Sequence, residues 1–310
     1  MIEAHALTKK FGSKTAVAGI DFRVEPGQVT GFLGPNGAGK STTMRMIAGL
    51  DRPTSGAVTV NGRRYRDHRA PLREVGILLD AKAVHTGRSA YKHLLAMAAT
   101  HGIGTKRVHD VIELAGLEAV AHKRVGGFSL GMGQRLGIAA ALLGDPATVI
   151  LDEPVNGLDP EGVRWVRTLV RGLAAEGRSV LLSSHLMSEM AQTADHLIVL
   201  GRGRVIADAS VDEVIARASG TSVRVRTPDI AGLNRAIAGP DVALSTLDDG
   251  AVVVTGLAAE QIGDIAWHAR IPVHELVALS SSLEDAYMTL TADEVEYRSA
   301  VVPTPEEATR

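Results

Sequence analysis

The chain has 310 residues, of which 45% are apolar and 22% charged, so one large domain and a smaller one with packed cores are expected. It contains no cysteine, which excludes disulfides, zinc–thiolate sites and thiol nucleophiles, and its net charge of −2 gives no case for nucleic acid as a partner. No run of about 18 apolar residues predicts a membrane span. The first residues, Met1-Ile-Glu-Ala-His5, lack the basic and apolar regions of a signal peptide, so a cytoplasmic location is expected.

Charge is distributed unevenly along the chain. Residues 1–220 hold 27 Lys and Arg against 21 Asp and Glu, whereas residues 221–310 hold 6 against 14. A mildly basic first part favours an anionic ligand such as a nucleotide. The change in sign predicts two separately folded regions with different surfaces.

The first 33 residues have the composition of a β-rich region. Apolar residues predict strands over 2–7, 15–17, 20–24 and 29–33, and Gly12-Ser13 and Pro26-Gly27 supply turns. Phe11 lies in a polar turn between the first two strands. Its ring either anchors the core at a strand end or stacks on a nucleobase, and the residues alone leave both interpretations open.

A glycine-rich segment follows the fourth strand directly. It runs Gly34-Pro35-Asn36-Gly37-Ala38-Gly39-Lys40-Ser41-Thr42 and fits G-x-x-x-x-G-K-[ST], the phosphate-binding P-loop. Its glycines permit a tight turn whose N–H groups point inward, and the next helix directs its positive end at the phosphates. Lys40 is expected to reach the β- and γ-phosphates, and Ser41 to ligate Mg²⁺. A mere glycine-rich turn is the alternative, which the flanking strand and helix disfavour.

A strand over 57–60 is predicted to enter a hairpin turn at Asn61-Gly62. A cluster of arginines comes next, which forms either a solvated face or a contact with a phosphate or a partner. Its members are Arg63, Arg64, Arg66, Arg69 and Arg73. A short strand over 75–79 ends in Asp80, and residues 89–144 have the helical period of an insertion between strands.

An apolar strand over 149–151 ends in two adjacent carboxylates, Asp152 and Glu153. Because α/β sheets bind ligands at the carboxyl ends of their strands, Asp152 is expected in the Mg²⁺ shell. Glu153 is placed to polarise an attacking water. Two acids in an ordinary turn would be the alternative if no P-loop preceded them.

A helix over 160–176 and a strand over 179–183 lead to Ser184-His185. His185 either neighbours a helix cap or contacts the γ-phosphate. Strands over 197–200 and 204–207 predict a hairpin, and a helix over 211–218 ends at Gly220.

The remaining chain has a different pattern. Strand 222–226, helix 230–237, strands 242–247 and 251–255, helix 259–269 and strand 273–278 follow one another. This βαββαβ order predicts a small two-layer α+β unit. The tail over 292–310 is expected to be disordered.

Together, these motifs resemble those of the ATP-binding cassette ATPases. The family's signature sequence is similar to Phe128-Ser129-Leu130-Gly131-Met132, and its D-loop resembles Asn156-Gly157-Leu158-Asp159. The resemblance covers residues 1–220 and implies that Phe11 stacks on the base of ATP and that His185 is the switch histidine. In the family, residues matching Ser129 and Gly131 contact the γ-phosphate held by the opposite chain.

The resemblance thus implies a set of site residues. Glu153 and His185 are the expected catalytic residues, and Ser41, Asp152 and Asp80 the expected metal ligands. At Asp80 the family usually has glutamine, which ligates Mg²⁺ and contacts the attacking water. The expected ATP-binding residues are Phe11, Gly34, Pro35, Asn36, Gly37, Ala38, Gly39, Lys40, Ser41, Thr42, Ser129, Gly131, Met132 and Asp159.

The fold implied is α/β, a P-loop NTPase of the ATP-binding cassette type with a helical insertion and a small C-terminal α+β domain. The cassette is expected over 1–220, with its helical subdomain at about 86–144, and the accessory domain over 221–291. This accessory unit, which closes with Ser282-Leu-Glu-Asp-Ala-Tyr-Met-Thr-Leu-Thr291, resembles the extension on ATPase subunits of bacterial exporters of the daunorubicin and bacitracin resistance type.

The resemblance implies ATP and Mg²⁺ as cofactors, and a pair of such chains, expected to be a homodimer, that drives a separate membrane permease for drug or antibiotic efflux. The protein would then lie on the inner face of the cell membrane, held there by the permease. Two alternatives stay open: a soluble cassette ATPase acting on ribosomes or DNA, and an ATP-dependent regulatory protein that senses through residues 221–291. Family members that act on ribosomes usually carry two cassettes, and those that act on DNA carry long coiled coils. This chain has one cassette and no long heptad run, which argues against the first alternative.

Overall fold

The computed structural model describes residues 1–81, 83–218, 222–240, 242–279 and 282–292, and they divide into two compact units. One unit comprises Met1–Val211 together with Thr291 and Ala292, and the other comprises Asp212–Leu290, so the first boundary falls at the start of α8 (Val211–Ala218). The expected division of the chain at residue 220 stays a prediction. Apart from Ala292, the expected disordered tail lies outside the described residues.

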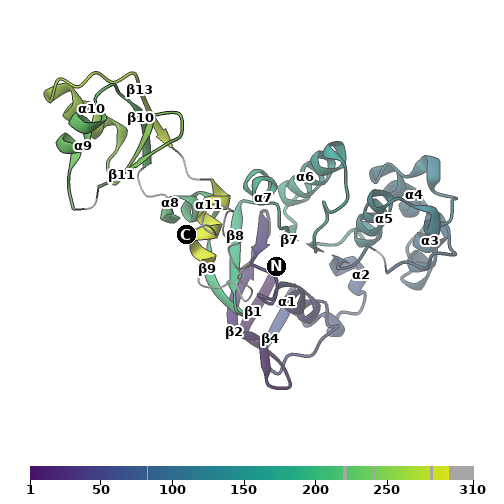
Figure 1. Cartoon of the computed structure of the whole chain (residues 1–310). Helices are drawn as coiled ribbons and strands as arrows, with labels where there is room; N and C mark the ends of the chain where they lie inside the picture. Colours follow the sequence, from purple (N-terminus) through teal and green to yellow (C-terminus); the bar gives the residue numbers. More distant parts are fainter. Residues whose placement is uncertain (82, 219–221, 241, 280–281, 293–310) are drawn as a thin grey trace, which may run out of the picture. The chain divides into compact units, whose positions relative to one another are not determined.

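A six-stranded sheet forms the centre of the first unit (Figure 1). Five of its strands are parallel, and only the last pair is antiparallel. Its central strands are buried along their whole length, because helices cover parallel sheets on both faces. In spatial order the strands are β5 (Val75–Leu78), β6 (Thr148–Leu151), β7 (Ser179–Ser183), β3 (Val29–Leu33), β8 (His196–Gly201) and β9 (Arg204–Ser210).

A second, antiparallel sheet has the order β2 (Lys14–Val24), β1 (Ile2–Phe11) and β4 (Ser55–Val60). The two strands predicted over 15–17 and 20–24 are therefore one strand. Gly19, at φ 66°, lies within it, and register shifts in its pairing with β1 interrupt the alternation of side chains. Phe11 is the last residue of β1 rather than a turn residue. The rings of Phe22 and Phe32, 5.7 Å apart, join this sheet to the core around β3.

The turn predicted after β4 is present. Val60 and Arg63 exchange backbone hydrogen bonds of 2.7 and 3.1 Å, and Asn61 and Gly62 both have positive φ. A type I′ hairpin turn requires positive φ at both of its central residues. Pairing ends there with a single bridge, and the chain continues into the short 3₁₀ helix η1 (Tyr65–Asp67).

The predicted helical insertion consists of three packed helices. They are α3 (Ala90–Thr100), α4 (Thr105–Leu114) and α5 (Leu130–Leu142). Each helix buries apolar residues, among them Leu94 of α3, Val111 of α4 and Leu136 of α5. The short 3₁₀ turns η2 (Glu118–Val120) and η3 (Val125–Gly127) connect α4 to α5.

Four further helices complete the first unit around its sheets. Their bounds are α1 (Lys40–Ile47), α2 (Pro71–Glu74), α6 (Pro160–Ala175) and α7 (Met187–Thr193). The long helix α6 buries one stripe that includes Val166 and Val170. It thus has the amphipathic period of a helix packed on a sheet.

The second unit has the βαββαβ order that the sequence predicts, and a helix follows it. Its antiparallel sheet runs β11 (Ala243–Thr246), β12 (Val252–Thr255), β10 (Ser222–Arg226) and β13 (Glu275–Leu279). Helices α9 (Ile230–Ile237) and α10 (Ala259–His268) pack on one face through a core that includes Val223 and Leu233 (Figure 1). The sequence analysis did not assign the final helix, α11 (Leu283–Thr291).

Candidate functional site

The glycine-rich segment joins β3 to α1. Gly39, at φ 104°, occupies the N-cap of α1, and a Cβ there would lie 2.6 Å from the carbonyl oxygen of Ala16, so only glycine fits. No side chain caps this helix, and the N–H groups of its first turn have no intrahelical acceptor. Such a loop offers donors to an anion at the positive end of a helix.

Lys40 lies against this loop. Its Nζ donates to the carbonyl oxygens of Gly34 at 2.5 Å and Pro35 at 3.3 Å. Burial lowers the pKa of the Lys40 ammonium, and the nearby carboxylates of Glu153 and Asp152 oppose this effect. The cation is therefore held inside the loop, close to both acids.

Asp152 follows β6 and is held by two hydroxyl groups. Ser41 Oγ donates to its Oδ2 at 3.2 Å, and Ser183 Oγ donates to its Oδ1 at 2.5 Å. These hard oxygen donors are the type that Mg²⁺ prefers, with one or two carboxylates and phosphate oxygens completing the shell. Among the described residues no group of three or more His, Cys, Asp or Glu could hold a metal alone. The residues therefore fit a Mg²⁺ ion shared with a phosphate ligand.

Glu153 has an unusual backbone that the surrounding side chains fix. Its φ of 51° lies in the left-handed region, which costs a non-glycine residue about 1 kcal/mol or more. Ser183 Oγ accepts from its N–H at 2.9 Å, and Gln134 Nε2 donates to its carbonyl oxygen at 3.0 Å. The carboxylate is thereby aimed at His185, whose Nδ1 lies 2.7 Å from Glu153 Oε2.

Two of these supporting residues were not identified from the sequence. Gln134 is buried in a helix whose other buried residues carry no polar side chain, which is a signal that this amide has a partner. Ser183 ends β7, the strand beside β6, and the carboxyl ends of neighbouring parallel strands share one edge. Both contacts join segments far apart in sequence, so only their general placement was predictable.

The signature and D-loop segments meet each other within the chain. Ser129 caps α5 by accepting from Met132 N at 3.2 Å, and Asp159 caps α6 by accepting from Gly162 N at 2.8 Å. A Cβ on Gly157 would lie 2.2 Å from Leu130 Cδ2, and one on Gly131 would lie 3.1 Å from the Gly157 carbonyl oxygen. Glycine at both positions lets the two loops pack closely.

Two further predicted residues lie at the surface. Phe11 is 52% exposed and is covered on one face by Lys9, with Nζ 4.9 Å from the ring centre, so it is not a core anchor. Asp80 is exposed two residues beyond β5, and its carbonyl oxygen accepts from Ala83 N. Because Asp152 N donates to the Leu78 carbonyl oxygen at 2.8 Å, the ends of β5 and β6 lie together.

The described helices include none that is long and apolar enough to cross a membrane. The P-loop, Asp152, Glu153 and His185 do meet at one edge of the sheet. Together they provide a phosphate cradle, two oxygen ligands for a hard cation and a positioned carboxylate.

Models of known protein families match three stretches of the chain. A model described as ABC transporter matches residues 17–156. A model of AAA domains, described as a putative AbiEii toxin of a type IV toxin–antitoxin system, matches residues 124–191 and so overlaps the first over residues 124–156. Residues 221–284 match a domain of unknown function. The ABC transporter model and the domain of unknown function thus match separate stretches of the chain.

Individual relatives extend the comparison. Bacitracin transport ATP-binding protein BcrA of Bacillus licheniformis is 40% identical over 70% of this chain and 72% of its own length. The uncharacterized ABC transporter ATP-binding protein YhcH of Bacillus subtilis is 34% identical over 96% and 97%. A solved dimeric ATP-binding cassette, in a post-hydrolysis state with ADP and Pi, shares the fold at a TM-score of 0.62 and 24% identity, covering 68% of this chain and 98% of its own.

Proposed function

The chain belongs to the ATP-binding cassette ATPases of ABC transporters, and from this premise we propose that two copies close around two ATP molecules and drive a separate membrane permease that exports antibiotics or drugs. The observation that carries the proposal is the meeting of Lys40, Asp152 and Glu153 at the end of the P-loop strand. The 40% identity to a bacitracin transport protein supports an exporter of antibiotics.

In this proposal the chain's own groups divide the work on the triphosphate. Lys40 and the N–H groups of the loop bind the β- and γ-phosphates, which places the scissile bond near Glu153. Ser41 and Asp152 would hold Mg²⁺, which supplies charge neutralisation when bound. Asp80, at the same edge of the sheet, is the third proposed ligand.

Glu153 is the proposed general base. Its carboxylate accepts a hydrogen bond from the attacking water and takes the water's proton. His185 lies against the carboxylate, with its Nδ1 2.7 Å and its backbone N 3.3 Å from Glu153 Oε2, while Ser183 and Gln134 hold the Glu153 backbone. The arrangement orients the base before water arrives, which is the purpose of preorganisation.

The second copy is proposed to complete each site. Ser129 lies at the N-cap of the 13-residue helix α5, whose positive end would meet the γ-phosphate bound by the partner's loop. The contact of Leu130 with Gly157 ties this helix to the D-loop, where Asp159 lies. Phe11 is exposed enough to stack on adenine.

The test is transport by vesicles that contain the chain and its permease. The permease would be sought as a protein of about six apolar spans, each of about 20 residues, encoded beside this chain. Inverted vesicles should then take up a bacitracin-type peptide only with hydrolysable ATP. Vesicles with Glu153→Gln should bind ATP but show no uptake, because the base is lost.

Two outcomes would count against the proposal in different ways. Uptake equal in Glu153→Gln and wild-type vesicles would remove Glu153 from the mechanism. Absence of uptake with an active ATPase would instead refute the exporter role and leave the ATPase assignment in place.

A further inference from the structure

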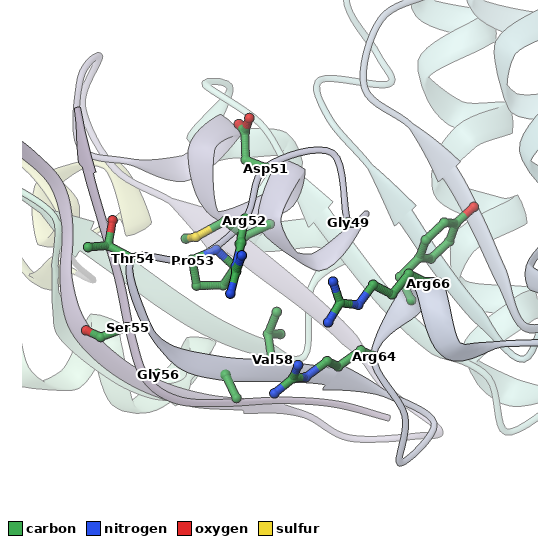
Figure 2. A pocket seen from close by; sticks show the side chains of 13 residues that line it. Gly49, Asp51, Arg52, Pro53, Thr54, Ser55, Gly56, Val58, Arg64 and Arg66 are labelled. Atoms are coloured by element: carbon green, nitrogen blue, oxygen red, sulfur yellow. The ribbon is translucent and has the colours of Figure 1, made fainter. Parts of the chain in front are cut away.

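The cassette unit contains a second concave site, away from the P-loop. It has a volume of about 250 Å³ and lies between the C-terminal end of α1, the start of β4 and η1 (Figure 2). Lys40 begins α1 and Met46, near its other end, lines this pocket. An eight-residue helix is about 12 Å long, so the two sites are distinct.

Three arginines from different elements line the pocket. Figure 2 shows the guanidinium groups of Arg52, Arg64 and Arg66 directed into one space around Val58. Arg52 and Arg64 make no side-chain ion pair or hydrogen bond among the described residues. The only pairing of Arg66 there is a 3.7 Å approach of its Nε to Asp67 Oδ1, with both side chains well exposed.

The one acidic residue of the pocket does not balance these charges. The Asp51 carboxylate accepts from Arg45 Nε at 2.7 Å and points away from the three guanidinium groups (Figure 2). Its two hydrogen bonds from Arg45 engage this carboxylate with a cation outside the group of three, and the hydrogen bonding also lowers the pKa of Asp51. Like charges that converge without an anion repel one another, and a bound anion would remove that repulsion.

The shape and lining of the pocket narrow the class of anion. Arginine forks match the oxygens of phosphate bidentately, and a phosphate monoester carries between one and two negative charges at neutral pH. Three guanidinium groups so close together are better matched by a phosphate monoester than by a ligand with a single carboxylate, which carries only one negative charge. Val58, Pro53 and the partly buried Tyr65 also line the pocket and offer apolar surface for the attached carbon portion.

We propose that this pocket binds a phosphate monoester through Arg52, Arg64 and Arg66. The group is either free, on a soluble metabolite, or presented as a lipid headgroup at a membrane surface. Glycerol 3-phosphate and phosphatidic acid carry the same phosphate in these two forms, so they serve as matched probes.

The experiment uses the full chain with its nucleotide site filled by adenylyl imidodiphosphate and Mg²⁺, so that phosphate cannot enter the P-loop. Calorimetry measures glycerol 3-phosphate binding. Co-sedimentation compares vesicles of phosphatidylcholine with phosphatidic acid against vesicles with phosphatidylserine, which is anionic without a monoester. Arg64→Gln/Arg66→Gln is the test variant. Arg63→Gln/Arg69→Gln is the matched control, because these exposed arginines lie in the same segment outside the pocket.

Binding of either phosphate probe should weaken about tenfold or more in the test variant, because each charged hydrogen bond is strong, and less than about twofold in the control. Glycerol 3-phosphate binding would identify a soluble source, and binding to phosphatidic acid vesicles alone a lipid headgroup. Equal weakening in both variants, equal binding to phosphatidylserine, or no binding of either probe would overturn the proposal.

Discussion

Among the residues that the structure describes, Ser183 is the one whose side chain hydrogen-bonds to both acids of the ATP site. Its hydroxyl donates to Asp152 Oδ1 and accepts from Glu153 N. A serine one position later, Ser184, instead accepts from Leu186 N and contacts neither acid. Ser183 therefore serves the ATP site, whereas Ser184 serves only the local turn, and substitutions at the two positions can be compared.

Ser183→Ala should weaken Mg²⁺-dependent nucleotide binding and lower the ATPase rate by about tenfold, since one lost buried hydrogen bond costs about 1–3 kcal/mol. Ser184→Ala should leave the Mg²⁺ dependence unchanged. Steady-state hydrolysis measured across a Mg²⁺ series checks both. Equal Mg²⁺ curves for wild type and Ser183→Ala would show that the hydroxyl does not support the site.

Asp80 is the departure from the family's usual residue. Aspartate can ligate Mg²⁺, but it is shorter than glutamine and, when ionised, has no N–H to donate. Its charge would also lie near the triphosphate and Asp152, where only a metal offsets it. We therefore predict an active enzyme whose rate rises unusually steeply with free Mg²⁺. The alternative is an Asp80 side chain that points to solvent and takes no part in Mg²⁺ binding. Asp80→Asn keeps the shape of the side chain and removes its charge, so the rise of its ATPase rate with free Mg²⁺ should be less steep. If the Mg²⁺ titrations of the wild-type and Asp80→Asn enzymes superimpose, Asp80 has no such role.

His93, in α3, gives the chain a predictable response to pH. Burial, followed by the charge of Arg88, lowers the pKa of this histidine below its ordinary value of 6.5. Between the two values the unfolded chain binds a proton that the folded chain does not, so stability falls as pH drops through 6.5. Urea midpoints should fall less between neutral pH and pH of about 5.5 in His93→Gln than in wild type. An identical fall would show that His93 does not contribute.

At the scale of elements, the packing of the signature helix α5 on the D-loop depends on Gly157. Its φ is 75°, and an added methyl would meet Leu130 Cδ2. Gly172, within α6, has open space around it and ordinary helical φ. The same substitution therefore has opposite consequences at the two sites.

Gly157→Ala should reduce the free energy of unfolding by about 1–3 kcal/mol and impair hydrolysis, because α5 and the D-loop must separate. Gly172→Ala should raise it by about 0.5–1 kcal/mol, since alanine favours a helix. Urea unfolding of the full chain measures both. A stable, fully active Gly157→Ala protein would contradict the account of this contact.

The elements also show where sequence patterns suffice. Strands such as β3 and β7 were predicted to within a residue because burial on both faces selects mostly apolar runs, interrupted here only by glycine and small polar residues such as Thr30 and Ser179. β2 was predicted as two strands because Gly19 and the register shifts break its period. α11 was missed, although Ser282 and Asp285 form the reciprocal hydrogen bonds of a capping pair that was visible in the sequence.

On the scale of the whole molecule, the order of the motifs predicted the α/β cassette. The separate patterning of the later residues predicted the βαββαβ unit. The P-loop and the two acids were expected at one edge because parallel strands bring their carboxyl ends together. The support of Glu153 by Gln134 and Ser183 was not predictable, because it requires the relative placement of α5 and β7.

The central claim is that two copies of the chain enclose two ATP molecules. Light scattering of the Glu153→Gln protein measures it directly, since this variant should bind ATP and Mg²⁺ without hydrolysing them. The account predicts twice the mass of the chain with ATP, two nucleotides per dimer, and the single-chain mass after exchange for ADP. A single-chain mass with ATP bound would contradict it.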